Sequence, residues 1–150
     1  MTLETSQSLR FVGLCNEPIV LASASITRRQ LLESAGVPHI VEPSCVDEGK
    51  IKISLRDDGA TGAEIAEVLA EAKAVQVSCN YLDKMVLGGD QVLECDEQTL
   101  DKPVNRADAL CQLQMLRGKR HSLISCAVIA CGGRRIWRGV DRATLQVRTD

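Results

Sequence analysis

The sequence predicts an α/β fold with a mixed, twisted sheet and flanking helices. Short apolar runs typical of buried strands alternate with helical patterns along the first two thirds of the chain, and a hairpin pattern follows them. Alternating strands and helices favour a parallel arrangement, whereas a hairpin adds antiparallel strands to the sheet. A chain of 150 residues with a hydrophobic fraction of 45% suits one domain with a substantial core.

The elements of the first third are indicated by apolar runs and the residues that interrupt them. Residues 1–17 are polar without a sustained period and are expected to form a flexible leader. Residues 18–22 are wholly apolar, which predicts a strand buried on both faces. A helix is expected after the Ser/Thr-rich turn that follows, ending at Gly36, and residues 39–42 predict a second strand.

The middle of the chain holds the clearest helix. Thr61 followed by Glu64 is a capping-box pattern. Residues then recur at helical spacing, namely Ile65, Val68, Leu69, Ala72 and either Val75 or Gln76. Residues 85–87 predict another buried strand, which runs into Gly-Gly-Asp-Gln and continues at residues 92–93.

The last third predicts a helix and a hairpin. Asn105 is a suitable N-cap for a helix that closes near Gly118. Residues 122–130 are strand-like and the Gly-Gly pair after them predicts a tight turn. Two short strands are expected beyond that turn, at residues 136–140 and 143–147.

Composition excludes several classes of function. The formal net charge is −2 and the aromatic residues are few, so neither a basic nor a base-stacking surface for nucleic acid is expected. No apolar run reaches membrane-spanning length, so no membrane partner is expected. The seven cysteines contain no C-x-x-C pair, and their odd number without a signal peptide favours a reducing, cytoplasmic location.

Residues 21–32, LASASITRRQLL, place hydroxyl and guanidinium groups where a strand gives way to a helix. A helix N-terminus favours an anion, so Ser23, Ser25, Thr27 and Arg28 would form a phosphate-binding turn. Alternatively, Ser25 or Thr27 simply caps the helix and the arginines face solvent. From this stretch alone, capping is the slightly better interpretation.

Three further features carry little weight by themselves. Asp47-Glu48 follows a strand, and paired acids in such a loop can ligate a divalent cation, although most are merely solvated. Lys73 lies within the amphipathic helix, where a lysine usually faces solvent. Lys102 is held at a turn by the proline after it and could meet a phosphate, yet basic turns are usually solvated too.

Asp90 is the most informative single residue. It comes directly after a buried strand and two glycines, so it is expected to project from the carboxyl end of the sheet, where the backbone can approach a ligand closely. An acid after a strand is a common metal or acid–base position in α/β enzymes. A functional role is therefore favoured over an incidental turn residue.

Taken in order, the segments LASAS, VDE, LAEAKA, LGGDQV, DKP and LRGKRH resemble the Maf-like nucleoside triphosphate pyrophosphatases, also called septum formation inhibitor proteins. The ordered set is specific although no single segment is, and it covers about residues 19–147. The resemblance implies a fold related to the inosine triphosphate pyrophosphatases, with two lobes around a cleft. It assigns residues 18–150 to the family domain and implies that the C-terminal part of that domain is missing.

The resemblance also implies hydrolysis of a nucleoside triphosphate to the monophosphate and pyrophosphate, assisted by Mg²⁺ or Mn²⁺. Carried over by motif, Ser23 and Arg28 of the SxSxxR turn would bind phosphates, with Ser25 beside them. Lys73 and Lys102 would bind phosphates as well, which reverses the interpretation of Lys73 as a solvated residue.

The same motifs assign the acids and the base contacts. Glu48 of VDE and Asp90 of GGDQ would surround the metal, and Asp90 matches the family's proposed proton acceptor. Thr27 and Gln91 occupy positions that touch the base. The pair VDE and GGDQ is closer to the branch associated with modified guanine nucleotides, such as 7-methyl-GTP, than to the dTTP/UTP branch with its GADT motif.

Two matters stay open at the level of sequence. The oligomeric state is one of them, with a homodimer as the expectation. The other is catalysis, because the alternative to an enzyme is a truncated, non-catalytic module that binds a nucleotide or a partner. Such a module would be stabilised by triphosphates without consuming them.

Overall fold

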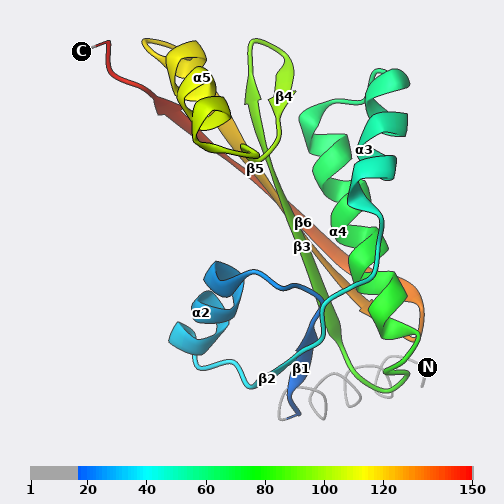
Figure 1. Cartoon of the computed structure of the whole chain (residues 1–150). Helices are drawn as coiled ribbons and strands as arrows, with labels where there is room; N and C mark the ends of the chain where they lie inside the picture. The colour runs from blue at the N-terminus through cyan, green and yellow to red at the C-terminus, as the bar shows by residue number, and fades with distance from the viewer. Residues whose placement is uncertain (1–16, 150) are drawn as a thin grey trace, which may run out of the picture. The chain divides into compact units, whose positions relative to one another are not determined.

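The computed structural model describes residues 17–149, so the expected leader lies almost wholly outside the described residues. The fold is mixed α/β, as predicted, with a six-stranded sheet and flanking helices (Figure 1). The elements in chain order are β1 (Ile19–Leu21), α2 (Ile26–Ser34), β2 (His39–Val41), α3 (Glu48–Asp57), α4 (Gly62–Ser78), β3 (Val86–Cys95), β4 (Gln98–Leu100), α5 (Arg106–Leu116), β5 (Arg120–Cys131) and β6 (Arg134–Gln146).

The sheet combines parallel and antiparallel pairs. Its strand order is β2-β1-β3-β5-β6, with β4 paired to β3. β1 runs parallel to both β2 and β3, whereas β4 returns along β3 as an antiparallel hairpin (Figure 1). Gly132 and Gly133 join β5 to β6 with positive φ angles of 55° and 78°, which a two-residue hairpin turn of this type requires.

The chain divides into two compact units. Of the described residues, unit 1 comprises 17–46, 71–88 and 128–137, and unit 2 comprises 47–70, 89–127 and 138–149. The long elements α4, β3, β5 and β6 contribute residues to both units. The single family domain over residues 18–150 and the cleft implied by the resemblance stay predictions.

The core of unit 1 forms around β1. Val20 and Ala22 are fully buried, together with Val86 of β3 and the nearly buried Val77 of α4. The half-buried ring of Tyr81 packs against this cluster. The prediction from the wholly apolar residues 18–22, that they form a strand buried on both faces, is therefore confirmed for β1.

The core of unit 2 forms where the start of α4 meets the sheet. Ile65 and Leu69 of α4 and Ile124 of β5 are each at most 1% exposed. The backbone N–H of Gly62 donates to the Glu94 carboxylate at 3.1 Å, and a Cβ at Gly62 would lie only 2.7 Å from the same carboxylate oxygen. A larger residue at this position would require the end of the Glu94 side chain to shift, so α4 begins in close contact with β3.

Residues 48–57 form helix α3, where the sequence indicated a loop at Asp47-Glu48 and no helix between that loop and Thr61. Asp47 caps this helix, since its side chain accepts a hydrogen bond from the Lys50 backbone N–H at 3.1 Å. None of the helical residues is buried. Its apolar residues Ile51, Ile53 and Leu55 alternate along the sequence, a spacing that does not by itself indicate a helix.

Two strand predictions also differ from the structure. β4 was missed, because the Asp96-Glu97 turn that leads into it has positive φ without a glycine. The two strands expected after the Gly-Gly turn form one strand, β6, whose polar middle suggested a break. Arg142 in that stretch of β6 forms an ion pair with Glu94 of β3, so its charged side chain helps to hold β6 in place.

Candidate functional site

The turn after β1 is organised around Ser23. This side chain is only 7% exposed, and its Oγ accepts hydrogen bonds from the Ser25 backbone N–H at 3.2 Å and from Arg28 Nη1 at 3.0 Å. Ser25 is the N-cap of α2, because its Oγ accepts from the Arg28 backbone N–H at 3.3 Å. Thr27 lies in the first turn of α2 and is exposed.

The turn can therefore cap the helix and still offer groups to a phosphate, so the two interpretations do not exclude each other. The capping role of Ser25 is confirmed, while Arg28 bends back to Ser23 instead of extending into solvent. The guanidinium group keeps further N–H donors beyond the one used on Ser23. Together with the positive end of the helix dipole, the turn has the chemistry of a phosphate-binding site.

Lys73 is buried in α4, at 5% exposure, and the interpretation as a solvated helix residue is wrong. It lies on the same helix face as Leu69 and Val77, at spacings of four residues, so the core-facing stripe of α4 includes a charge. The predicted stripe was also shifted, since Val68 is 40% exposed. Burying an ammonium group is unfavourable without compensation, and lysines are seldom buried unless they are paired or functional.

Asp90 is buried as well, at 7% exposure. The prediction that it comes directly after the end of a strand is wrong. It lies inside β3, which continues to Cys95. The register of β3 with β1 ends at Leu87, and its register with β4 starts at Leu93. Asp90 therefore belongs to a stretch of β3 that lies outside both of these ladders.

Glu48 and Lys102 are linked through α3. Glu48 is the first residue of this helix. Further along α3, Lys52 Nζ and Arg56 Nη1 contact the two oxygens of Asp101 at 3.0 and 2.9 Å. Asp101 precedes the exposed Lys102 in the sequence. These ion pairs therefore attach α3, which contains Glu48, to the loop that contains Lys102.

These contacts also set the charge state of Asp101. The hydrogen bond from Arg56 is the largest cause that holds the pKa of the carboxyl group below its ordinary value of 3.8. Lys52 acts in the same direction, while partial burial opposes both. The carboxylate is thus ionised at neutral pH and can hold α3 and the loop together.

Gln91 is exposed in β3, and its Nε2 donates to Ser125 Oγ on β5 at 3.0 Å. Sequence reasoning missed Ser125, which lies in none of the motif segments. A lone serine within a strand carries no functional pattern of its own. Only the pairing of β3 with β5 shows that it meets Gln91.

The candidates fall into two groups, one on each unit. Unit 1 carries Ser23, Ser25, Thr27, Arg28 and Lys73, and unit 2 carries Glu48, Asp90, Gln91 and Lys102. The buried polar or charged residues of the described chain are Ser23, Lys73, Ser78 and Asp90. Three of these four are candidate residues, so the family motif and the pattern of burial overlap at Ser23, Lys73 and Asp90.

A divalent metal fits the donor chemistry of the acids. Glu48 and Asp90 supply carboxylate oxygens, the hard ligands that Mg²⁺ and Mn²⁺ take. Within the described residues, no group of three or more His, Cys, Asp or Glu side chains is placed to hold a metal. Mg²⁺ bound to nucleotides generally takes one or two carboxylates together with phosphate oxygens.

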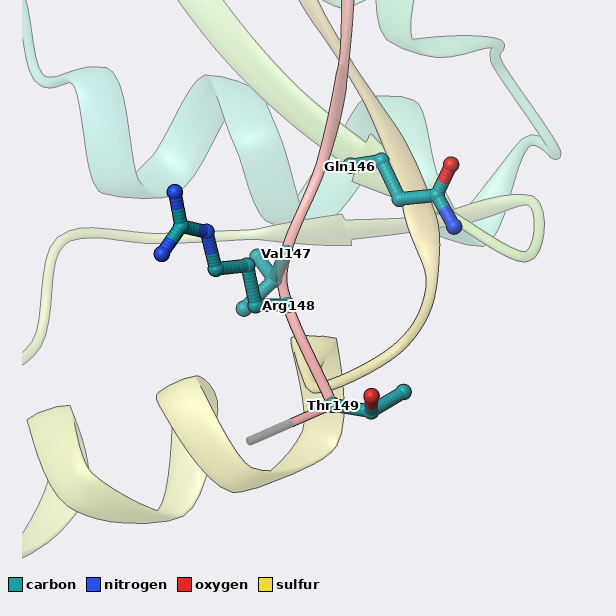
Figure 2. Close-up of a pocket in the computed structure, with 4 residues that line it drawn as sticks. All are labelled: Gln146, Val147, Arg148 and Thr149. Atoms are coloured by element: carbon teal, nitrogen blue, oxygen red, sulfur yellow. The ribbon is translucent and has the colours of Figure 1, made fainter.

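Two surface hollows lie away from the candidate residues. Figure 2 shows the first, in unit 2, lined by the last described residues, Gln146, Val147, Arg148 and Thr149. Gln146 and Arg148 extend to opposite sides of the chain there (Figure 2). The second, in unit 1, is lined by Glu42, Pro43, Cys45, Gln76, Val77 and Asn80. Neither hollow includes a residue assigned by the motifs.

Comparison with known proteins identifies relatives. The profile of the Maf-like protein family matches residues 18–149. A protein of Ruegeria sp. (strain TM1040) named nucleoside triphosphate pyrophosphatase is 48% identical over 130 residues, which are 87% of this chain and 65% of that protein. A protein of the same name from Paramagnetospirillum magneticum is 42% identical over 86% of this chain and 66% of its own length. The chain thus spans slightly less than two thirds of these relatives.

The fold also has a counterpart among solved structures. A HAM1 protein from Coxiella burnetii superposes with a TM-score of 0.50 at 13% identity, covering 85% of this chain and 70% of that one. At that identity the likeness concerns the fold alone. Among the described helices, none has both the length and the apolar character needed to cross a membrane. The expected homodimer and cytoplasmic location stay predictions.

Proposed function

Because this chain belongs to the Maf-like protein family, we propose that it hydrolyses a nucleoside triphosphate to the nucleoside monophosphate and pyrophosphate. The named relatives support this activity, although they are longer than this chain. The observation that carries the proposal is the burial of Ser23, Lys73 and Asp90, at 7%, 5% and 7% exposure. Lysine and aspartate are almost never buried unless they are paired, and the family motifs give Lys73 and Asp90, as well as Ser23, a role.

The cationic residues are proposed to hold the triphosphate. Arg28, anchored to Ser23 at the N-terminus of α2, supplies guanidinium donors next to helix N–H groups. Lys73 and Lys102 add two point charges, of which the buried Lys73 acts in surroundings with little water. Charges placed in advance stabilise the negative charge that builds on phosphate oxygens during attack at the α-phosphorus.

Glu48 and Asp90 are proposed to hold Mg²⁺ or Mn²⁺ together with the substrate's phosphates. A bound divalent cation screens the phosphate charge and lowers the pKa of a coordinated water. Asp90 orients the attacking water and accepts its proton, a role that suits a carboxylate held within a strand and shielded from bulk solvent. Asn at this position would keep the shape and lose the proton acceptor.

Thr27 and Gln91 are proposed to contact the base, and both are exposed to a ligand. The motif pair VDE and GGDQ favours a modified guanine nucleotide, such as 7-methyl-GTP, as the substrate. The preference follows from the motifs alone, so a panel of bases is needed to establish it.

A nucleotide panel with Mg²⁺ or Mn²⁺ tests the proposal on this chain. The expected result is pyrophosphate release from at least one triphosphate, lost in Asp90→Asn. The second candidate function is a non-catalytic nucleotide-binding module. In that case triphosphates would raise the melting temperature while remaining intact, and measurable hydrolysis would exclude it.

A further inference from the structure

We propose that Arg56 is a positioning residue that holds the loop of Lys102 in place for contact with the substrate's phosphates. This inference rests on the proposed function, in which Lys102 binds a phosphate. Arg56 lies in α3, outside all of the motif segments, and its assignment comes from its contacts with β4 and with the loop that follows β4. The helix, the strand and the loop all belong to unit 2.

The guanidinium group of Arg56 joins two points on either side of the end of β4. Its Nε donates to Thr99 Oγ1 within β4 at 3.0 Å, and its Nη1 donates to Asp101 Oδ2 just beyond the strand at 2.9 Å. Arginine can only donate, and its planar group fixes the directions of its donors relative to one another. Both bonds therefore form together only while the end of β4 and the start of the loop keep one arrangement.

Two further contacts hold Asp101, the residue directly before Lys102. Lys52 Nζ, one turn before Arg56 in α3, contacts the other oxygen of the Asp101 carboxylate at 3.0 Å. Gln112 Nε2, from α5, donates to the Asp101 backbone carbonyl at 3.0 Å. Asp101 is thus held through both its side chain and its backbone, by groups from two helices.

The far end of the loop is fixed as well. The backbone N–H of Val104 donates at 3.0 Å to the carboxylate of Asp108, which lies in the first turn of α5. Lys102 and Pro103 lie between the two held positions, and the proline ring restricts its own φ. The backbone that carries the exposed Lys102 side chain is therefore ordered before a substrate arrives.

The side of α3 that meets this loop also carries the proposed metal ligand. Glu48, Lys52 and Arg56 are spaced four residues apart, so their side chains lie along one side of the helix. Lys52 and Arg56 reach the loop from that side. A carboxylate for the metal and an ammonium group for a phosphate are thereby carried on two attached elements, which suits a triphosphate with a bound metal.

The order of this loop matters for binding, because a group that is already in place loses less freedom when it contacts a ligand. Arg56→Lys keeps the positive charge but loses the planar group that spans Thr99 and Asp101. The substitution therefore separates positioning of the loop from simple electrostatic attraction of the substrate. The contacts of Asp101 with Lys52 and Gln112 do not depend on residue 56, so the variant is expected to stay folded.

The test is a double-mutant cycle between Arg56→Lys and Lys102→Ala, with the preferred triphosphate at saturating Mg²⁺. For Arg56→Lys alone, KM is expected to rise about 3- to 10-fold, the range set by one hydrogen bond, with a smaller change in kcat. In the Lys102→Ala background, the same substitution should change KM by less than about 2-fold, because the group that Arg56 positions is absent.

Arg142→Lys is the matched control. Arg142 of β6 likewise pairs with a carboxylate on a distant element of unit 2, Glu94 of β3, and that pair lies outside the loop. The KM of this variant should stay within about 2-fold of the wild-type value, because the loss of an exposed ion pair has little effect by itself.

The outcomes separate this inference from the proposed function. If the wild-type chain hydrolyses a triphosphate and Arg56→Lys raises KM equally in the presence and absence of Lys102, the inference is overturned while the proposed function stands. An unchanged KM in Arg56→Lys, or an equal rise in Arg142→Lys, overturns it as well. If a triphosphate is bound without hydrolysis, its Kd replaces KM in the same cycle, with the same expected and contrary results. If the wild-type chain neither hydrolyses nor binds any nucleotide, the proposed function fails and the inference fails with it.

Discussion

Arg28 Nη1 donates to Ser23 Oγ at 3.0 Å, across the turn that joins β1 to α2. The contact ties the first turn of a helix to the end of a buried strand, so the guanidinium group has a defined place beside the helix N-terminus. The adjacent Arg29 is different, since its Nε pairs with Glu33 along the exposed side of the same helix. Two neighbouring arginines thus have separable roles, which allows a matched comparison.

Arg28→Lys is expected to raise KM for the triphosphate about 10-fold or more. Lysine keeps the charge but loses the planar donor group that reaches Ser23 and a phosphate together, and hydrogen bonds to charged groups contribute about 1.5–3 kcal/mol. Arg29→Lys should leave KM within about 2-fold, because an exposed helix pair contributes at most about 0.5 kcal/mol. Steady-state kinetics on both variants measures the difference. Equal effects of the two substitutions on KM would show that Arg28 does not bind the triphosphate as proposed.

Asp90→Asn is expected to lower kcat by at least about 100-fold, since the proton acceptor is lost. Nucleotide binding, followed by thermal shift, should persist. Asp96→Asn is the control, because Asp96 lies in the exposed β3–β4 turn with a positive φ that asparagine also tolerates. A folded Asp90→Asn protein with wild-type turnover would remove Asp90 from the chemistry.

Turnover is expected to require a divalent cation. A chelator should stop pyrophosphate release, and Mg²⁺ or Mn²⁺ should restore it. Glu48→Gln should raise the Mg²⁺ concentration needed for half-maximal rate, because a neutral amide is a weaker ligand than a carboxylate. Glu33→Gln, on the exposed side of α2, should leave the requirement unchanged. Metal-independent hydrolysis would contradict the role assigned to the acids.

Asp101→Asn is expected to reduce the free energy of unfolding at pH 7 by less than about 1 kcal/mol, because the carboxylate is half exposed and its ion pairs are screened. The pKa of Asp101 is lowered by folding, so its contribution is present above the ordinary value of 3.8 and is lost as the pH falls through the lowered value. Urea unfolding at neutral and acidic pH should therefore show the wild-type advantage vanishing toward acid. An advantage that grows as the pH falls would reverse the assigned sign.

Local signals in the sequence predicted much of the fold. The Thr61 and Glu64 capping box is present, with the Thr61 backbone N–H donating to the Glu64 carboxylate at 2.7 Å. Asn105 caps α5 as expected, accepting from the Asp108 backbone N–H at 2.8 Å. Each of these interactions joins residues close in sequence, which is why residue type and spacing suffice to predict them.

Other features depend on pairings between distant residues. The burial of Lys73 follows from which face of α4 packs inward, and the contact of Gln91 with Ser125 follows from the register of two strands. The contact of Arg56 with Asp101 similarly joins α3 to a loop 45 residues away. Spacing along the chain carries no information on these contacts. The family motifs indicated Lys73 and Gln91, but Ser125 required the structure.

Hydrolysis of the preferred triphosphate in ¹⁸O-labelled water tests the central claim most directly. Attack of water on the α-phosphorus would place the label in the nucleoside monophosphate and leave pyrophosphate unlabelled, which is the predicted result. Label in pyrophosphate, release of inorganic phosphate with a nucleoside diphosphate, or intact triphosphate bound to folded protein would each contradict it.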